Sequence, residues 1–292
     1  MKIIVFGGDG YCGWPLSLGL SNAGHDVTII DNLSSRTGNE EYSLSNRLLA
    51  WKTKTQKVIN FKKVDIALNY QGLNDVIRKT EPECIFMLTD KISVLPVVNE
   101  ENKLKSLDFK NNVFSCFQIM SSLFENKLTD CHVYYFVEPL YNLDITTDIN
   151  FYMLYLFQKK IKAFNNLRFL SFCNVWGKDT DLTSFDQALT NRINKSNLIM
   201  TMLKNDGFEF DKEVKYSFTH IQDFVNKTLA EFQREEKEFK IKKLYTESLT
   251  YNQIFKIFQK ESKGFYRDEK DIYLSPEALH ELTELIRDTK DL

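Results

Sequence analysis

The first 36 residues combine a short apolar run, three evenly spaced glycines, a helical stretch and a second apolar run. Residues 3–6 are apolar and rich in branched side chains, which is typical of a strand buried on both faces. Gly7, Gly10 and Gly13 follow at three-residue spacing, and the leucine-rich stretch after them ends near Gly24. This order predicts a strand, a tight glycine turn and a helix that begins at the turn.

A second buried strand is expected at residues 27–30, and it ends in Asp31. In such a unit the first glycine, Gly7, allows a tight turn, Gly10 lets the backbone approach a pyrophosphate, and Gly13 lets the helix lie close to the strand. The amino end of the helix attracts the phosphates. Asp31 can accept hydrogen bonds from both adenosine ribose hydroxyls and would repel a 2′-phosphate, so the pattern predicts NAD rather than NADP. A glycine turn that binds nothing is the alternative, which the complete order of elements disfavours.

Composition narrows the classes of partner. The chain has 292 residues, 43% of them hydrophobic, and a net charge of −2. These values indicate a globular fold and give no electrostatic support for a nucleic-acid or anionic-membrane partner. No apolar stretch approaches membrane-spanning length, and the amino terminus enters a strand without a signal peptide. We therefore expect a cytoplasmic protein.

The cysteines and histidines do not have the spacing of a metal site. The five cysteines are scattered and odd in number, and the four histidines are equally dispersed. We expect reduced, mostly buried thiols and no metal ion.

The spacing Gly-x-x-Gly-x-x-Gly resembles that of the extended short-chain dehydrogenases/reductases, the nucleotide-sugar epimerases and dehydratases. The sequence is most similar to the UDP-sulfoquinovose synthase branch in two segments, Gly-Gly-Asp-Gly-Tyr-Cys-Gly-Trp-Pro at residues 7–15 and Asp31-Asn32-Leu33. This resemblance implies an α/β fold, a Rossmann-type doubly wound parallel sheet with a small C-terminal α/β substrate-binding part. The NAD-binding domain would span residues 1–165, and residues 166–292 would complete the sheet and form the substrate-binding domain.

The same resemblance implies further cofactor contacts. Three lie beside the glycine turn and Asp31, and four lie at or directly after the ends of the third and fourth strands, which we expect at residues 58–64 and 83–88. They are Tyr11, Cys12, Asn32, Asp65, Ile66, Leu88 and Thr89. In the family an aspartate at the place of Asp65 binds the adenine amino group; an acidic cap for the helix at residues 73–77 is an equal alternative. Thr89 either lines the ribose and phosphate region or crowds it.

Tyr155 and Lys159 form a Tyr-x-x-x-Lys pair in a helical stretch at residues 151–164. Four residues apart, their side chains share one face of a helix. In the resembled family the tyrosine takes a proton from the sugar hydroxyl while NAD takes a hydride, and the lysine binds the nicotinamide ribose and favours the phenolate. The alternative is an amphipathic helix with a packed tyrosine and a solvated lysine. The position of the pair, after the fifth strand at residues 132–137, favours the active site.

Other positions of the catalytic pattern diverge. The family's catalytic serine or threonine is replaced by Val137, which has no hydroxyl. Glu138 could act as a general acid, or it is a solvated loop carboxylate. Asn174 matches a residue that contacts the sugar-nucleotide phosphate. The diphosphate-binding arginine is Tyr216, and the neighbouring Lys215 offers a substitute charge.

The sequence thus predicts an NAD-dependent nucleotide-sugar epimerase/dehydratase-type enzyme that works through transient C4 oxidation of a sugar, most simply a UDP-sugar. The resemblance also implies a homodimer, with a long helix at residues 104–123 in the interface. The alternative is a catalytically degenerate NAD-binding relative that acts as a sensor or partner subunit. A reductase of a non-nucleotide carbonyl compound is the third possibility.

Overall fold

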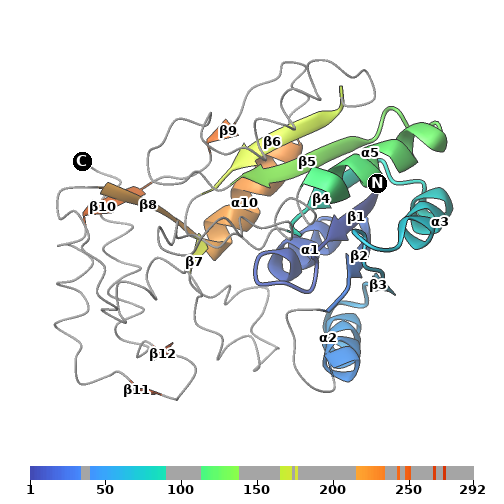
Figure 1. The fold of residues 1–292 in the computed structure, drawn as a ribbon. Helices are drawn as coiled ribbons and strands as arrows, with labels where there is room; N and C mark the ends of the chain where they lie inside the picture. Colours follow the sequence, from blue (N-terminus) through green and yellow to red (C-terminus); the bar gives the residue numbers. More distant parts are fainter. Residues whose placement is uncertain are drawn as a thin grey trace.

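Seven parallel strands form the main sheet of the protein (Figure 1). The computed structural model describes residues 1–33, 40–89, 113–137, 165–172, 175–176, 215–233, 242–243, 247–250, 266–267 and 272–273. The strands are β1 (Lys2–Phe6), β2 (Asp26–Asp31), β3 (Ile59–Lys63), β4 (Cys84–Met87), β5 (His132–Val137), β6 (Leu167–Ser171) and β9 (Lys242–Lys243). Their order is β3-β2-β1-β4-β5-β6-β9. The predicted Rossmann-type fold class is confirmed.

The strand order places a topological switch point at β1. From β1 the chain adds β2 and β3 on one side, and it then returns to add β4 and β5 on the other. Ile3 pairs with both Val27 of β2 and Cys84 of β4, so β1 lies between them in a parallel register. In open α/β sheets a ligand binds at the carboxyl ends of the strands next to such a switch. The glycine turn, which follows β1, lies at this place.

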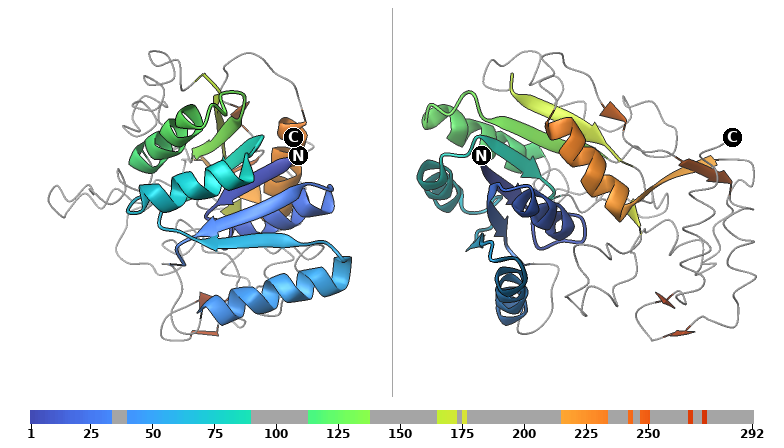
Figure 2. Two further views of the ribbon diagram at one scale, coloured as in Figure 1. Left: turned by 90° about the vertical axis from the view of Figure 1, so that its right-hand side faces the viewer. Right: turned by 180° about the vertical axis from the view of Figure 1, so that it is seen from behind.

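Helices cover both faces of the sheet (Figure 2). One face carries α1 (Gly13–Asn22), α2 (Glu40–Thr55) and α10 (Ile221–Phe232), and the other carries α3 (Tyr70–Thr80) and α5 (Ser115–Glu125). Alternate residues of β1 serve the two layers, because Ile3 and Val5 pack toward α1 whereas Ile4 and Phe6 pack toward α3 and α5. Continuous apolar strands were therefore a correct indication of a sheet that is buried on both sides.

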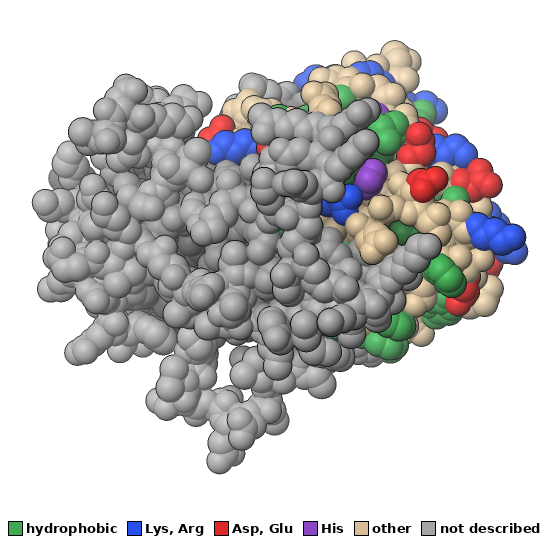
Figure 3. All heavy atoms as spheres, turned by 90° about the horizontal axis from the view of Figure 1, so that it is seen from above, with side chains coloured by type: hydrophobic (Ala, Val, Ile, Leu, Met, Phe, Trp, Pro, Cys, Tyr) green, Lys and Arg blue, Asp and Glu red, His purple; other side chains and the backbone are tan. Residues whose placement is uncertain are grey.

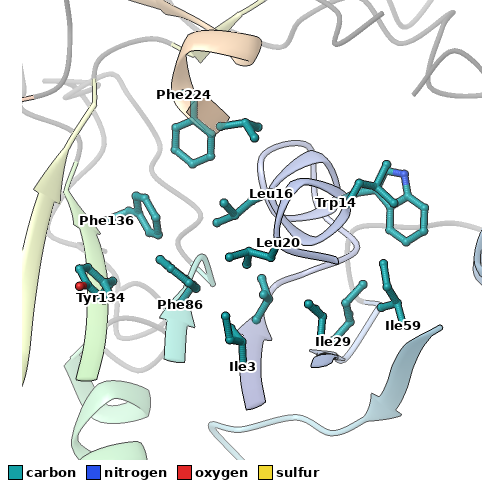
Figure 4. Close-up of a cluster of buried hydrophobic side chains, with 14 of the residues drawn as sticks. Ile3, Trp14, Leu16, Leu20, Ile29, Ile59, Phe86, Tyr134, Phe136 and Phe224 are labelled. Carbon is teal, nitrogen blue, oxygen red and sulfur yellow. The ribbon is translucent and has the colours of Figure 1, made fainter. Parts of the chain in front are cut away.

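The core between α1 and the sheet also includes a helix from late in the sequence. Leu16 and Leu20 of α1 point toward Phe86 and Phe224, while Trp14 leaves α1 on the side of Ile59 (Figure 4). The side chains of these α1 residues and of Phe86 and Phe224 are buried, and the burial of each contributes about 2 kcal/mol of transfer free energy. The ring of Phe224 in α10 lies 4.5 Å from that of Phe172, between centroids. Residues 221–232 thus help to hold α1 against the sheet.

Small additional strands lie apart from the main sheet. A three-stranded sheet has the order β10-β8-β7, from β7 (Val175–Trp176), β8 (Lys215–His220) and β10 (Glu247–Thr250). A hairpin pairs β11 (Tyr266–Arg267) with β12 (Ile272–Tyr273). These strands were not among the predictions from the sequence. β7, β11 and β12 have two residues each, too few for a periodic signal, whereas β8 alternates in polarity and does carry such a signal.

The predicted element boundaries mostly agree with the structure to within two residues. The helix α2 has sixteen residues, and α5 continues to Glu125, two residues beyond the predicted end of the long helix at residue 123. Residues 104–112, the first part of the predicted long helix, lie outside the described residues. Acidic and basic side chains are interspersed on the described surface seen from above (Figure 3). Among the described helices, none combines the length and apolar character that a membrane span requires.

Candidate functional site: the glycine turn and the carboxyl edge

The turn after β1 requires glycine at its first position. The backbone N–H of Gly7 donates a hydrogen bond to the carbonyl oxygen of Ile30, at 2.9 Å, which ties the turn to the end of β2. Gly7 has φ +70°, a region that favours glycine, and a Cβ there would lie 2.4 Å from the carbonyl oxygen of Leu88. The predicted role of Gly7 in a tight turn agrees with this geometry.

Gly10 and Gly13 differ in how closely other backbone atoms approach them. A Cβ on Gly13 would lie 2.1 Å from the Gly7 carbonyl oxygen, so the start of α1 lies directly against the turn. Within the described residues, a Cβ on Gly10 would meet only that same oxygen, at 3.0 Å. The described residues therefore leave the backbone of Gly10 open to the approach of a ligand. Cys12 occupies the N-cap position of α1, where helix N–H groups and the helix dipole attract anions.

Asp31 lies at the carboxyl end of β2, beside the glycine turn. Its Oδ2 accepts a hydrogen bond from the backbone N–H of Asp9, at 3.1 Å, and its Oδ1 accepts one from the N–H of Leu33, at 2.8 Å. The carboxylate is half-buried, so part of it still faces solvent. The structure thus brings Asp31 next to the turn, as the sequence predicted, and fixes the direction of its side chain.

Two charged residues of this region were not singled out in the sequence. Asp9, inside the turn, is buried and forms an ion pair with the buried Arg47 of α2; Oδ1 and Nη1 are 2.5 Å apart. The guanidinium carbon of Arg47 also lies 4.1 Å from the centroid of the Trp14 ring. Periodicity could not reveal this contact, because Arg47 is an isolated charge in a largely polar helix. The sequence did offer one signal, Asp9 itself, because a carboxylate is unusual between the glycines of such a turn.

Asn32 and Asp65 meet at the ends of β2 and β3. The side-chain amide of Asn32 donates a hydrogen bond to Asp65 Oδ2, at 3.1 Å. The other oxygen of Asp65 accepts hydrogen bonds from the N–H groups of Ala67 and Leu68, at 3.0 and 3.2 Å. Asp65 therefore closes the turn before α3. The alternative of Asp65 as the helix cap is wrong, because Asn69 caps α3 by accepting a hydrogen bond from Gly72 N–H at 2.9 Å.

The remaining predicted cofactor-binding residues lie at the same edge of the sheet and differ in how exposed they are. Ile66 is buried in the core, 7% exposed, beside the Asp65 turn. Leu88 follows β4, and its N–H donates to the Phe6 carbonyl oxygen at 3.0 Å, while Thr89 comes next and is half-buried. Tyr11 and Cys12 of the turn are half-buried as well. Their contacts with a cofactor stay predictions.

Several predicted site residues lie outside the described residues: Glu138, Tyr155, Lys159 and Asn174. The backbone positions around them are informative. Val137 is the last residue of β5 and pairs with Ser171, the last residue of β6, at the carboxyl edge of the sheet. Lys215 begins β8 of the small sheet, where it pairs with Thr250. Its predicted role toward the diphosphate stays a prediction.

A cavity of about 540 Å³ lies at the opposite edge of the main sheet. It is lined by the end of α5, by residues 128–131 before β5, and by Asn165 and Asn166 before β6. None of the predicted site residues lines it, and ligands of open α/β sheets bind at the carboxyl edge instead. Among the described residues, His, Cys, Asp and Glu form no group of three that could hold a metal ion.

Comparisons with known proteins relate both the sequence and the fold to sugar-nucleotide enzymes. No protein-family model matches the chain. The chain is 28% identical to the chloroplastic UDP-sulfoquinovose synthase of Spinacia oleracea over 141 residues, which are 45% of this chain and 29% of that protein. It is 35% identical to the UDP-sulfoquinovose synthase of Sulfolobus acidocaldarius over 102 residues, 32% of this chain and 26% of that protein. The matches thus span less than a third of these curated relatives.

The fold extends the likeness over nearly the whole chain. A UDP-glucose 4-epimerase structure from Stenotrophomonas maltophila, with bound NAD and formylated UDP-arabinopyranose, superposes with a TM-score of 0.65. The sequence identity is 16%, and the match covers 97% of this chain and 92% of that one. The chain therefore shares the fold of this UDP-glucose 4-epimerase structure, and part of its sequence is similar to the UDP-sulfoquinovose synthases.

Proposed function

We propose that this chain binds NAD across the carboxyl edge of its main sheet and works as a nucleotide-sugar epimerase/dehydratase-type enzyme. The observation that carries the proposal is the placement of Asp31. Its carboxylate is held by the N–H groups of Asp9 and Leu33, beside a glycine turn at the topological switch point. The likeness to UDP-sulfoquinovose synthases and to an NAD-bound UDP-glucose 4-epimerase supports the same class of cofactor and substrate.

The described residues fit an adenine dinucleotide. The open backbone at Gly10 and the amino end of α1 would hold the pyrophosphate, and Asp31 would hold the adenosine ribose. Asp65 and Ile66 would flank the adenine, with the Asn32 amide orienting one Asp65 oxygen. Gly7, Gly13, Tyr11 and Cys12 shape the turn, and Leu88 and Thr89 border it at the end of β4.

The chemistry of the site would be transient oxidation at C4 of a UDP-sugar. When bound, NAD supplies a hydride acceptor that later gives the hydride back. Tyr155, as phenolate, would take the proton of the C4 hydroxyl as the C4 hydrogen leaves with both bonding electrons as a hydride, and the loss of both would leave a ketone at C4. Lys159 binds the nicotinamide ribose, and its charge favours the phenolate. Protonated Tyr155 returns the proton when the ketone is reduced.

The divergent positions would adapt this site to its substrate. Val137 cannot relay a proton, so the neighbouring Glu138 is the group that we propose as general acid. Asn174 and Lys215 would hold the sugar-nucleotide phosphates, with Lys215 supplying a single charge where the family has a bidentate arginine. The division into a cofactor part at residues 1–165 and a substrate part at 166–292, a homodimer and a cytoplasmic location belong to the same proposal.

Two measurements test the proposal. The purified protein is first denatured, and the released small molecules are analysed by mass spectrometry for NAD. The protein is then given UDP-glucose, with and without sulfite, and the reduced nicotinamide absorbance and the products are followed by spectrophotometry and NMR. We expect bound NAD and a C4-altered or sulfonated product. NAD binding without any reaction of UDP-sugars would instead support the catalytically degenerate relative, and absence of NAD binding would contradict both.

A further inference from the structure

Arg47 is buried in α2 although it carries a full charge. Its side chain and that of Asp9 are 5% and 2% exposed, and the ion pair between them is 2.5 Å long. Burying two charges in this way costs desolvation free energy, which favours pairs with a role beyond stability. The ring of Trp14, itself fully buried, covers the guanidinium at 4.1 Å. This ion pair joins α2 to the turn between β1 and α1.

The location of Asp9 poses an electrostatic problem. Asp9 directly precedes Gly10, whose open backbone is the proposed place of the pyrophosphate. A carboxylate beside two phosphates would repel them, and burial away from water would strengthen the repulsion. The backbone N–H of Asp9 is nevertheless needed, because it donates the hydrogen bond that orients Asp31. A cation close to the Asp9 carboxylate removes the conflict.

We propose that Arg47 is a positioning residue for the dinucleotide. It neutralises Asp9 and contacts the residues on both sides of the segment 10–13, namely Asp9 and Trp14. Through these contacts the turn can accept an anionic pyrophosphate. The inference rests on the proposed NAD binding, and it adds a charge-compensating residue from a helix outside the glycine motif.

The test compares charge variants of the full chain by calorimetric titration with NAD. Arg47→Met removes this cation from the Asp9 carboxylate and should weaken NAD binding by about tenfold or more. Asp9→Asn keeps the backbone N–H and removes the negative charge, so its affinity for NAD should equal or exceed that of the unsubstituted chain. The double variant Asp9→Asn with Arg47→Met should bind NAD within about threefold of the unsubstituted chain. A purely structural role would lower the melting temperature of all three without this order of affinities.

Arg78→Met is the matched control. Arg78 forms a 2.8 Å ion pair with Asp75 on the exposed side of α3, away from the turn, and its loss should leave the affinity within about twofold. Folding of each variant is checked by circular dichroism. If Arg47→Met is folded and binds NAD normally, or if the double variant binds as weakly as Arg47→Met, the inference is overturned.

If Arg47→Met does not fold, Asp9→Asn decides, and an affinity below that of the unsubstituted chain overturns the inference. Absence of NAD binding by the unsubstituted chain would overturn the proposed function together with this inference. Normal binding by that chain with the wrong order among the variants would overturn the inference alone.

Discussion

The carboxylate of Asp31 accepts a hydrogen bond from the backbone N–H of Asp9, with 3.1 Å between the nitrogen and Oδ2. A second hydrogen bond comes from Leu33 N–H at 2.8 Å. An ionised carboxylate has about four lone-pair positions, and these two bonds occupy one position on each oxygen and fix its orientation. The end of β2 is therefore prepared for hydroxyl groups before any ligand arrives.

Asp31→Ser should weaken NAD binding and reduce the preference for NAD over NADP. Hydrogen bonds to a charged group contribute about 1.5–3 kcal/mol, which corresponds to a loss of about 10- to 150-fold in affinity. NADP should lose less affinity than NAD, because the repulsion of its 2′-phosphate disappears. Calorimetric titration with both dinucleotides gives the ratio.

Asp26→Ser is the matched control for this variant. Asp26 begins the same strand at the opposite edge of the sheet and lies exposed near Asn60. It should bind both dinucleotides as the unsubstituted chain does. An unchanged NAD/NADP ratio in Asp31→Ser would show that this carboxylate does not select the cofactor.

Gly10→Ala should separate ligand binding from stability. The new Cβ would meet the Gly7 oxygen at 3.0 Å, a contact that a small backbone shift relieves, but it would occupy the approach to the pyrophosphate. We expect a small loss of melting temperature and a loss of NAD affinity of about tenfold or more. In Gly13→Ala the Cβ would lie 2.1 Å from that oxygen, so its main effect should be a destabilisation of about 3 kcal/mol or more. Thermal unfolding and NAD titration of both variants would refute this distinction if Gly10→Ala bound NAD normally.

Much of the fold could be predicted because local signals agree with the tertiary structure. The run at residues 3–6 is apolar at every position because β1 is buried on both faces. Glycine is required at positions 7 and 13 because an added Cβ would lie 2.4 and 2.1 Å from a carbonyl oxygen. Asp31 was found because it ends a buried strand. The strand β5 was predicted with its observed limits, His132–Val137.

Other features depend on contacts between distant segments. No local pattern indicates that Arg47 lies against Asp9, 38 residues earlier, or that α10 covers α1. From the sequence, Asp65 could bind the adenine or cap the next helix. The hydrogen bond from Gly72 N–H to the Asn69 side chain shows that Asn69, not Asp65, caps α3. The short strands β7 and β10 are defined by their partners in the small sheet rather than by their own composition.

The buried cysteines should resist alkylation in the native protein. Burial raises the pKa of the Cys131 thiol to about 12, with a further contribution from the charge of Glu83. Burial also raises the pKa values of Cys84 and Cys116 far above their usual range. Because the thiolate is the reactive form, all three should react with iodoacetamide at neutral pH only after unfolding, whereas half-buried Cys12 should react in the native state. Peptide mapping measures this order, and native labelling of Cys116 as fast as Cys12 would contradict it.

Tyr155→Phe should slow turnover strongly while leaving NAD binding intact. The variant loses only the phenol that we propose as the base, so the rate should fall by about 10²- to 10⁴-fold. Tyr152→Phe is the control, since this nearby tyrosine has no lysine four residues later. Product formation from UDP-glucose is compared by NMR for the two variants. Equal rates in both would exclude Tyr155 as the base.

The placement of the dinucleotide is tested most directly by a crystal structure of the chain grown with NAD and UDP-glucose. We expect the pyrophosphate against the backbone of Gly10–Gly13 and the adenosine ribose on the carboxylate of Asp31. The nicotinamide should lie beside Tyr155 and Lys159, next to the sugar. Electron density for NAD elsewhere on the protein, or a glycine turn whose approach is filled by side chains, would contradict the proposed function.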